Sequence, residues 1–356
     1  MKLPYPIAVG HGMLDRLQDV VRTVSGSNRV ALISDQPVIR RYGTRVAKLL
    51  ALGARDRFTI PGGERHKTRA TWAKLTDQLL ARGFGRDTTI VALGGGVVGD
   101  VVGFVAATYM RGVPVVQVPT TLLAMVDASV GGKTGVDTPA GKNLVGAFHQ
   151  PAAVLVDLEV LATLPAEHLR AGFAEVIKHG VIADANYFEE ATSFAARWPS
   201  PRASLRGLLP LITGSISIKS SIVSHDEREA GLRKVLNFGH TIAHAIESAT
   251  RYRVLHGYAV AMGMVAEARL AELLGVAQRG TAQAIASVCA MAGLPTTLPR
   301  VSVTALVKLT HGDKKARAGK VEYALPKRIG EMAGGDRGWG IPVEDTLVRD
   351  VLSKVT

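Results

Sequence analysis

The sequence predicts an α/β N-terminal domain with a mostly parallel sheet, followed by an α-helical C-terminal domain. The chain has 356 residues, more than one compact core usually holds, so two domains are expected. Up to about residue 160, short apolar segments alternate with helical ones, which is typical of a parallel sheet covered by helices. Beyond that point the segments have a helical period and lack strand punctuation. We expect the domains to span residues 1–165 and 166–356.

The N-terminal half contains the elements of such a sheet. Buried strands are predicted where segments rich in β-branched residues are bounded by turn residues, at 29–35, 87–96, 113–121 and 152–158. Two segments between them, 38–53 and 69–83, place apolar residues three and four apart and end in glycine, as helices do.

The C-terminal half is predicted to be helical. Helical periodicity runs through 208–226, 241–250 and 259–275, whereas 315–335 contains a candidate small hairpin. Ligands favour the clefts between domains, so chemistry that uses both halves is expected there.

The composition is that of an ordinary globular protein with an excess of positive charge, and we expect it to lie in the cytoplasm. The net charge is +13, from 43 basic and 30 acidic residues, and it attracts phosphorylated metabolites, nucleic acid or anionic membranes alike. The basic residues are scattered and no aromatic residues lie among them, so we expect no nucleic-acid partner. The first twenty residues lack the apolar core of a signal peptide, and no apolar run reaches the ~18–20 residues that span a bilayer. The single cysteine, Cys289, cannot form an internal disulfide, which fits a reducing compartment.

Three glycines directly follow the predicted strand at 87–96 and lead into a helix. Without side chains, Gly94, Gly95 and Gly96 allow the backbone to approach a pyrophosphate, at which the helix N-terminus aims free N–H groups. The pattern is not the G-x-G-x-x-G fingerprint, so a tight strand–helix turn explains it equally well. Asp100 can orient backbone amides instead of touching a ligand.

A second glycine pair lies in 61–67, where Glu64 can accept ribose hydroxyls and Lys67 can meet phosphate. An exposed turn before the next helix is the alternative. Segment 120–148 is predicted to be a long irregular loop with no helix longer than two turns. Its Lys133 and Lys142, each beside glycine, suit an anionic substrate or cofactor, although lysines are usually solvated.

The C-terminal half contains candidate metal ligands. His240 and His244 lie four residues apart on one face of a helix, and His256 opens the next helix. Glu175, with Lys178 one turn further along, completes a set of the kind that holds catalytic zinc. The alternative is that each histidine is a satisfied buried or capping group.

Several charged residues can form one cationic pocket. They are Lys219, Glu229 and Arg233, together with Lys314 and Lys315. An arginine fork and several ammonium groups suit a substrate that carries both carboxylate and phosphate. A solvated surface is the ordinary explanation for such charges.

At roughly residues 60 to 335 the chain resembles the 3-dehydroquinate synthase family. The segments that carry the resemblance occur in the family's order and spacing: GGGVVGDVVGFVAATYMRG, VPTTLLAMVDASVGGKTGVD, GKNLVGAFHQP, TLPAEHLRAGFAEVIKHG, SHDEREAGLRKVLNFGHTIAHAIE and LHGYAVAMGM. They are long and specific, unlike a lone glycine motif.

The resemblance implies a Rossmann-like first domain, NAD and one divalent metal, usually zinc or cobalt. The family converts 3-deoxy-D-arabino-heptulosonate 7-phosphate into 3-dehydroquinate and phosphate. The steps implied are transient oxidation by NAD, phosphate β-elimination, re-reduction and an intramolecular aldol closure. A homodimer is implied because Arg111 resembles an arginine that reaches into the neighbouring subunit's site.

Carried over residue by residue, the resemblance implies Glu175, His240 and His256 as metal ligands, with His244 a nearby catalytic or phosphate-site group. The implied NAD contacts are Asp35, Glu64, Lys67, Gly95, Gly96, Val97, Val98, Gly99, Asp100, Thr120, Thr121, Lys133, Lys142, Val160, Leu161, Ala162 and Thr163. The implied substrate and catalytic contacts are Arg111, Asp127, Lys133, Lys142, Asn143, Lys178, Lys219, Glu229, Arg233, Asn237, His244 and Lys314.

The sequence departs from the family pattern at Met125, Ala128, Ala243 and Tyr258, none of which replaces a charged catalytic group. Three alternatives stay open. The chain can be another sugar-phosphate cyclase, such as one that makes an amino-dehydroquinate, a valiolone or an inosose. It can be a polyol or glycerol-phosphate dehydrogenase of related fold, or a basic nucleic-acid-binding protein, which only the charge supports.

Overall fold

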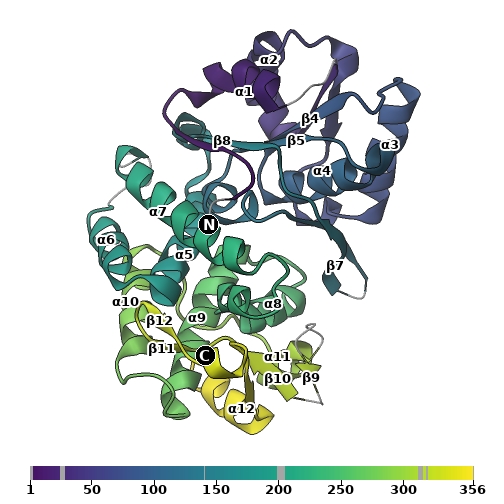
Figure 1. The fold of residues 1–356 in the computed structure, drawn as a ribbon. Coiled ribbons are helices and arrows are strands. Elements are labelled where there is room, and N and C mark those ends of the chain that lie inside the picture. The colour runs from purple at the N-terminus through teal and green to yellow at the C-terminus, as the bar shows by residue number, and fades with distance from the viewer. Residues whose placement is uncertain are drawn as a thin grey trace. The chain divides into compact units, whose positions relative to one another are not determined.

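The computed structural model describes residues 3–24, 29–139, 141–198, 205–311, 316–317 and 320–355. The chain forms two compact units whose boundary falls between Leu164 and Pro165. The first is an α/β unit and the second is mainly helical (Figure 1), so the predicted fold class is confirmed. Among the described residues, no helix is both long and apolar enough to span a bilayer.

The first unit is built on a six-stranded sheet in the order β1-β8-β5-β4-β2-β3, in which every neighbouring pair is parallel. Its strands are β1 (Ile7–Gly10), β2 (Arg29–Asp35), β3 (Arg57–Ile60), β4 (Thr88–Gly94), β5 (Val115–Pro119) and β8 (Ala153–Asp157). The four strands predicted from the sequence are β2, β4, β5 and β8. The two that were missed, β1 and β3, lie at the sheet edges and have four residues each, too few for a period to stand out.

Helices cover both faces of this sheet. They are α1 (Leu17–Val24), α2 (Gln36–Leu49), α3 (Arg69–Ala81) and α4 (Gly96–Thr108), with short helical turns at Met13–Arg16, Ala54–Asp56, Glu64–His66, Tyr109–Arg111, Ala124–Ala128 and Leu158–Thr163. α3 and α4 pack on one face, where Leu75, Val101 and Val105 join Ile33 and Ile90 in one buried cluster. α1 and α2 contact each other on the opposite face. The alternation of strands and helices therefore produces the layers that the sequence predicts.

Segment 120–148 is more regular than predicted. β6 (Lys133–Thr138) and β7 (Gly141–Phe148) form an antiparallel hairpin, so the expectation of an irregular loop is wrong there. Glycines hid the strands from a search for alternating apolar residues. A Cβ on Gly146 would lie 2.1 Å from the Thr134 carbonyl oxygen, so this close pairing requires glycine. Val136 and Val145 then pack against the cluster beneath α4.

The second unit is a set of helices in which α9 contacts α5, α8, α10 and α12. The helices are α5 (Ala166–Ala183), α6 (Ala185–Ala196), α7 (Leu208–His225), α8 (His240–Ala249), α9 (His256–Leu273), α10 (Thr281–Met291), α11 (Val303–Thr310) and α12 (Asp345–Ser353), with short turns at Leu205–Gly207, Leu232–Asn237 and Gly335–Arg337. The three predicted helices are α7, α8 and α9. Because α9 is buried nearly all round, its sequence is apolar on every face rather than on one.

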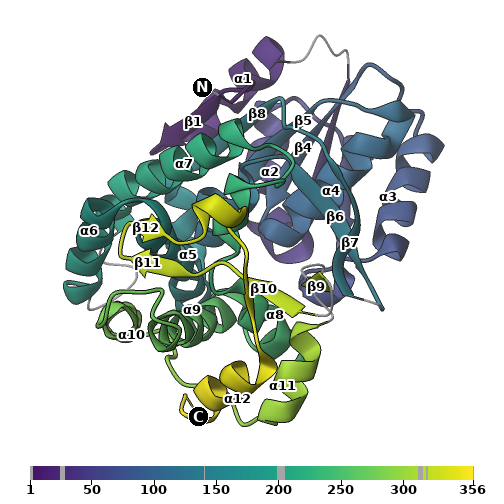
Figure 2. The ribbon, with the colours of Figure 1, turned by 60° about the horizontal axis from the view of Figure 1, so that its bottom comes forward.

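Short strands complete this unit. They are β9 (Ala316–Arg317), β10 (Lys320–Tyr323), β11 (Pro326–Arg328), β12 (Glu331–Met332) and β13 (Ile341–Val343). β10 pairs antiparallel with β9 and β13, and β11 pairs with β12 beside α5 (Figure 2), which confirms a small hairpin within 315–335.

Candidate active site

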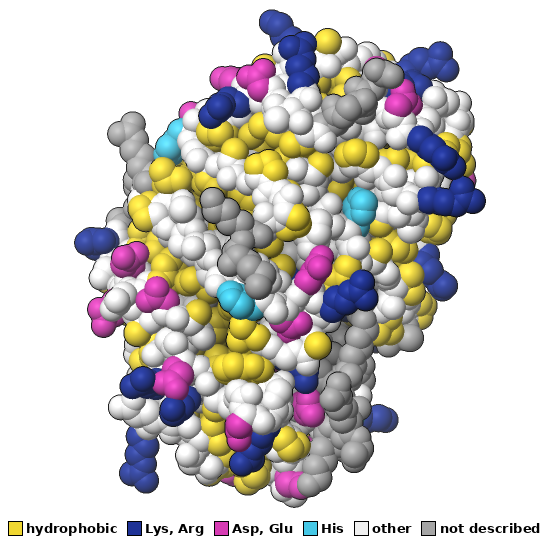
Figure 3. All heavy atoms as spheres, viewed as in Figure 1, with side chains coloured by type: hydrophobic (Ala, Val, Ile, Leu, Met, Phe, Trp, Pro, Cys, Tyr) yellow, Lys and Arg dark blue, Asp and Glu magenta, His cyan; other side chains and the backbone are white. Residues whose placement is uncertain are grey.

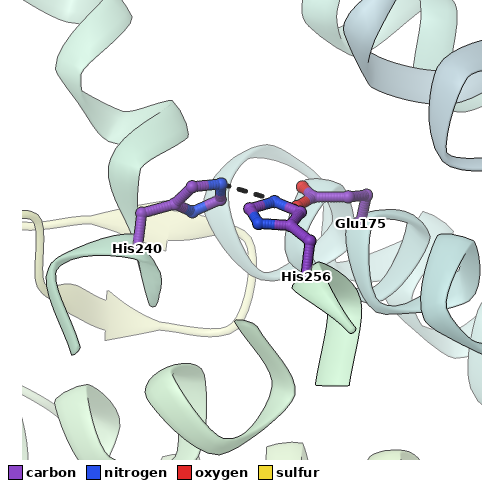
Figure 4. Close-up of side chains that lie close together, drawn as sticks. All are labelled: Glu175, His240 and His256. Atoms are coloured by element: carbon purple, nitrogen blue, oxygen red, sulfur yellow. Dashed lines mark ion pairs between the residues drawn. The ribbon is translucent and has the colours of Figure 1, made fainter. Parts of the chain in front are cut away.

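Three helices of the second unit bring a carboxylate and two imidazoles together (Figure 4). Glu175 comes from the middle of α5, and His240 and His256 are the first residues of α8 and α9. The Nε2 atoms of His240 and His256 each lie 3.5 Å from Glu175 Oε1. One ligand atom from each of the three residues lies within 4.8 Å of the others. This donor set fits a divalent cation of the zinc type.

The charges around this trio (Glu175, His240 and His256) set the protonation of its imidazoles in opposite directions. Burial, with the Lys178 ammonium, lowers the pKa of His240 well below its ordinary value, although Glu175 opposes this effect. Burial also lowers the pKa of His256, but Glu247 and Glu175 more than offset it and raise the pKa to about 10. Only a neutral imidazole can ligate a metal, so a cation would take the place of the His256 proton.

Lys178 and Glu175 form a fully buried ion pair one turn apart on α5. His244, one turn after His240 on α8, lies outside the trio, with ring centroids 5.6 Å from His240 and 6.4 Å from His256. The spacing of four residues suggested a His240–His244 metal pair, but the group of ligand atoms that converges does not include His244. The partner that converges with His240 is His256 from the next helix.

Two further predicted cations are buried in this unit, on elements that contact α5. Lys219 on α7 is 7% exposed and Arg233 is 1% exposed. Arg233 Nη1 donates to the Glu227 carbonyl oxygen. Its backbone N–H donates to Asp226 Oδ2 over 3.0 Å, and the same carboxylate accepts from the N–H groups of Ala230 and Gly231. These hydrogen bonds lower the pKa of Asp226, although burial opposes them.

Asn237 ends the turn that contains Arg233, and its Nδ2 donates to Glu229 Oε1 over 2.5 Å. Asp226 was not singled out from the sequence. Its signal is an aspartate directly after a helix, followed within five residues by glycine, a pattern in which the side chain caps the following backbone. Lys314 and Lys315 lie outside the described residues.

In the first unit, the predicted glycine turn joins β4 to α4. A Cβ on Gly94 would lie 2.5 Å from the Val98 side chain, and one on Gly95 would lie 3.1 Å from Thr121. A side chain at Gly94 would therefore clash with Val98, and one at Gly95 would lie tightly against Thr121. Beside it, the Thr120 N–H donates to the Gly94 carbonyl oxygen, and Thr120 Oγ1 is buried with no hydrogen-bond partner among the described residues. A buried hydroxyl left in this state favours a bound polar ligand.

The predicted cofactor contacts follow the carboxyl ends of β2, β3, β4, β5 and β8, which meet at one edge of the parallel sheet. The connection after β2 leads to β3 on one side, whereas the connection after β4 leads to β5 on the other. A reversal of this kind marks the usual place for a dinucleotide. Asp35 ends β2 and accepts the Val38 N–H over 3.0 Å, while burial raises its pKa.

Several of the implied contacts can offer only backbone atoms. The side chains of Val98, Val160 and Leu161 are at most 2% exposed, and Gly99 accepts a hydrogen bond from Gln117 through its carbonyl oxygen. Val97 packs on the buried cluster of the sheet. Ala162 and Thr163 are exposed, and the Thr163 hydroxyl lies 2.7 Å from that of Tyr42.

A network of charged groups joins the β3–α3 connection to the hairpin. Lys67 Nζ lies 2.5 Å from both Asp100 Oδ2 and Asn143 Oδ1. Burial lowers the pKa of Lys67, but Asp100, Glu64 and Asp137 outweigh it and raise the pKa. Lys142 and Asn143, which are implied substrate contacts, therefore lie beside the implied cofactor contacts Glu64 and Lys67.

The remaining contacts of this network are made by residues of the hairpin. Lys142 Nζ pairs with Glu64 Oε1 at 2.8 Å, and Asp137 Oδ1 accepts the Asn143 N–H at 3.0 Å. Asp137 was missed in the sequence because it lies on the hairpin, which was not predicted.

The remaining predicted residues of this unit are more exposed. Asp127 lies in the short π-helix Ala124–Ala128, and Lys133 is an exposed residue at the start of β6. Arg111 is exposed and has a left-handed backbone with a φ of 70°. On the face shown in Figure 3, Lys and Arg side chains are dispersed among Asp and Glu rather than gathered in one stripe.

Comparison with known proteins finds relatives that match nearly the whole length of the chain. The model of the 3-dehydroquinate synthase N-terminal region matches residues 57–171, and that of the C-terminal region matches residues 172–316. The 3-dehydroquinate synthase of Synechococcus sp. is 47% identical over 342 residues, which cover 94% of this chain and 92% of that protein. The enzyme of the same name from Microcystis aeruginosa is 46% identical, with 98% of this chain and 95% of that protein covered.

Solved structures give the same picture. A 2-deoxy-scyllo-inosose synthase in complex with carbaglucose-6-phosphate, NAD+ and Co2+ superimposes with a TM-score of 0.88 at 28% identity, covering 98% of this chain and 96% of that one. A 2-epi-5-epi-valiolone synthase from Streptomyces hygroscopicus with NAD+ and Zn2+ gives the same TM-score and identity, covering 100% and 97%. A probable glycerol dehydrogenase from Sinorhizobium meliloti shares the fold alone, at 18% identity, with a TM-score of 0.68 and coverage of 99% and 96%. The resemblance read from the sequence is confirmed, and the chain belongs to the 3-dehydroquinate synthase family.

Proposed function

We propose that this enzyme converts 3-deoxy-D-arabino-heptulosonate 7-phosphate into 3-dehydroquinate and phosphate. The observation that carries the proposal is the trio of Glu175, His240 and His256, whose ligand atoms lie within 4.8 Å of one another. Relatives that carry the name of this activity match nearly the whole chain, and the inosose and valiolone synthases are less similar in sequence.

The trio fits a zinc or cobalt ion, and the strand ends of the first unit fit NAD. The buried, unpartnered Thr120 hydroxyl and the glycine turn at 94–96 support a dinucleotide at that edge. A divalent cation supplies Lewis acidity to the oxygens that it touches, and NAD supplies a reversible acceptor for hydride. We therefore assign residues 1–165 to NAD binding and residues 166–356 to metal and substrate binding.

The chain's own groups hold the substrate and its charges. Lys178 pairs with Glu175 and keeps that carboxylate in place on α5. Lys219 and Arg233 are buried cations that suit the carboxylate and phosphate of the substrate. Holding reacting atoms in line in this way can lower a barrier by about 7–11 kcal/mol at best.

The polar groups beside these cations complete the assignment. Glu229 orients the Asn237 amide, and His244, beside the trio, is assigned to the phosphate end of the substrate. Asp127, Lys133 and Lys314 are assigned to the same substrate from the family pattern.

The cofactor assignment has two parts. Gly95, Gly96 and the first turn of α4 offer backbone N–H groups to the pyrophosphate. Asp35 and Glu64 offer carboxylates to ribose hydroxyls, whereas Lys67 and Lys142 balance the phosphate charge. Val98, Gly99, Val160 and Leu161 contribute through main-chain atoms.

The proposal includes a homodimer in the cytoplasm. Arg111 is exposed in the short turn Tyr109–Arg111 that follows α4 and has a left-handed backbone, and its exposure suits a residue shared with a second copy. The one cysteine, Cys289, is buried and forms no disulfide, which suits a reducing compartment.

One experiment separates this reaction from its rivals. The metal-loaded protein is incubated with the heptulosonate phosphate and a catalytic amount of NAD, and phosphate, carbocycle and NADH are measured together. We expect phosphate and 3-dehydroquinate in equal amounts with no net NADH. Accumulating NADH would instead identify a dehydrogenase. Turnover only of the phosphorylated sugars used by inosose or valiolone synthases would identify another cyclase.

A further inference from the structure

The two helices that present imidazoles to the trio are linked by buried carboxylates that neither the sequence patterns nor the comparisons single out. His240 opens α8 and His256 opens α9. Glu267 in α9 contacts the start of α8, and Glu247 in α8 contacts the start of α9. Each helix thus supplies a carboxylate to the imidazole-bearing end of the other.

Glu267 fixes the backbone on both sides of His240. Its side chain is fully buried, and its Oε2 accepts the Gly239 N–H over 2.6 Å while its Oε1 accepts the Ile242 N–H over 3.1 Å. The N-cap of α8 is Gly239, which has no side chain to satisfy these donors. A carboxylate from another helix therefore takes the place of the usual capping side chain, where the helix dipole also favours a negative charge.

The main chains around the trio touch where these carboxylates act. A Cβ on Gly263, one turn before Glu267, would lie 2.0 Å from the Gly239 carbonyl oxygen. A Cβ on Gly257, beside His256, would lie 1.8 Å from the carbonyl oxygen of Ala171, one turn before Glu175. α9 therefore lies in backbone contact with both other helices that carry a member of the trio. This contact brings Glu267 within hydrogen-bonding reach of the start of α8.

Glu247 orients the other imidazole. It is 2% exposed, and its Oε1 lies 3.3 Å from His256 Nδ1, while His256 Nε2 faces Glu175 Oε1 at 3.5 Å. The same division holds at His240, whose Nδ1 lies 3.1 Å from the Phe238 carbonyl oxygen and whose Nε2 faces Glu175. With an acceptor at each Nδ1, each imidazole presents its Nε2 to the trio, and in the neutral ring this nitrogen can bind a cation.

We propose that Glu247 and Glu267 are reciprocal positioning residues, each holding the metal-ligating imidazole at the start of the other's helix. The inference rests on the proposed function, because it assigns the trio to a divalent cation. The two carboxylates are 2% and 0% exposed, and they act through His256 and the α8 backbone. Their loss is therefore expected to alter the metal site before it alters substrate binding.

The test uses Glu247→Gln and Glu267→Gln in the full chain, with Glu272→Gln as the matched control. Glu272 also lies on α9 and also caps a helix, since its Oε1 accepts the Ala282 N–H at the start of α10 over 2.9 Å. Co2+ affinity is measured by competition with a chromophoric chelator, and the visible spectrum of the Co2+ protein reports ligand geometry. Thermal unfolding and the separate values of kcat and KM complete the set.

We expect Co2+ affinity to fall roughly 10- to 100-fold in each of the two variants, which is the usual loss when a hydrogen-bond partner of a metal ligand is mutated. The Co2+ spectrum should change and kcat should fall, with KM for the heptulosonate phosphate nearly unchanged. Glu272→Gln should lower the unfolding temperature and leave affinity and spectrum as in the parent. If Glu267→Gln does not fold, Glu267→Asp replaces it, because it keeps the charge on a shorter side chain.

The inference is overturned if both variants lose thermal stability while Co2+ affinity and spectrum match those of the parent, because that result describes a purely structural role. Failure of the proposed function gives a different result. In that case the parent protein itself binds no Co2+ or Zn2+ at a ratio of one per chain, before any variant is made.

Discussion

The two regions assigned to ligands are organised in contrasting ways. In the second unit, Glu175, His240 and His256 stand on regular helices, and close glycine contacts join the backbone of α9 to those of the other two helices. In the first unit, the polar groups stand on connections after strands and on a hairpin, and Lys67 is held by Asp100 and Asn143. The first arrangement is a rigid donor set that a cation can complete. The second is a network in which a cofactor must exchange existing partners.

This difference predicts that single changes at the metal trio have the largest effects. In His240→Ala and in His256→Ala, one of three ligands is lost. We expect the loss of Co2+ affinity to exceed the ~10–100-fold that outer-sphere partners contribute, and turnover to fall with it. Bound metal is measured by elemental analysis and turnover by phosphate release. The control is His225→Ala, a histidine at the exposed end of α7. If both variants retained one metal ion per chain, the trio would not be the metal site.

A substitution at the buried Arg233 tests whether substrate binding in the second unit also depends on the exact position of one side chain. Arg233→Lys keeps the charge but loses the planar fork, so we expect kcat/KM to fall roughly 10- to 100-fold, as a lost hydrogen bond to a charged group implies. Metal content should not change. Arg228→Lys, an exposed position in the same loop, is the control. Equal kinetics for the two variants would contradict the role given to Arg233.

The network in the first unit should respond separately. Lys67→Met removes the ammonium that joins Asp100 to Asn143, so NAD affinity should fall by roughly tenfold while Co2+ affinity stays the same. NAD binding is measured by titration calorimetry, and Lys74→Met on the exposed face of α3 is the control. A parallel loss of Co2+ affinity would show that the two regions are not energetically separate.

The smallest expected effect is a pH dependence of the metal-free protein. The folded pKa of His256 is about 10, above its ordinary value of 6.5, so its contribution to stability is complete below about 6.5 and is lost as pH rises toward 10. Glu247→Gln removes a main cause of the raised pKa. The difference in unfolding temperature between parent and Glu247→Gln should therefore shrink from pH 6.5 to pH 10. A difference that is constant over this range would mean that Glu247 does not stabilise the protonated imidazole.

Most of the fold could be predicted from the sequence because the pattern of apolar residues is clear in the elements that are buried. β2, β4, β5 and β8 consist mostly of buried apolar residues, and α7, α8 and α9 carry long helical patterns. The hairpin of β6 and β7 escaped because glycine replaces the side chains that would alternate. β1 and β3 escaped because four residues carry too little pattern.

The candidate site was less accessible to sequence reasoning. Spacing within one helix paired His240 with His244, whereas the packing of α8 against α9 brings in His256 instead. The resemblance to a family selected the group of three whose ligand atoms converge in the structure, because it carries tertiary information that spacing lacks. Glu247, Glu267 and Asp137 were not singled out because isolated acids in a sequence look like solvated charges.

The glycine contacts at Gly257 and Gly263 have a consequence for how such an enzyme tolerates change. Since peptide atoms rather than side chains set the separation of these helices, the span between Glu175, His240 and His256 does not depend on how the surrounding apolar residues are chosen. The interior of the helical unit can accumulate substitutions over generations while the coordination geometry stays constant. Mutational drift in this unit is therefore limited not only at the trio but also at two residues that have no side chain at all.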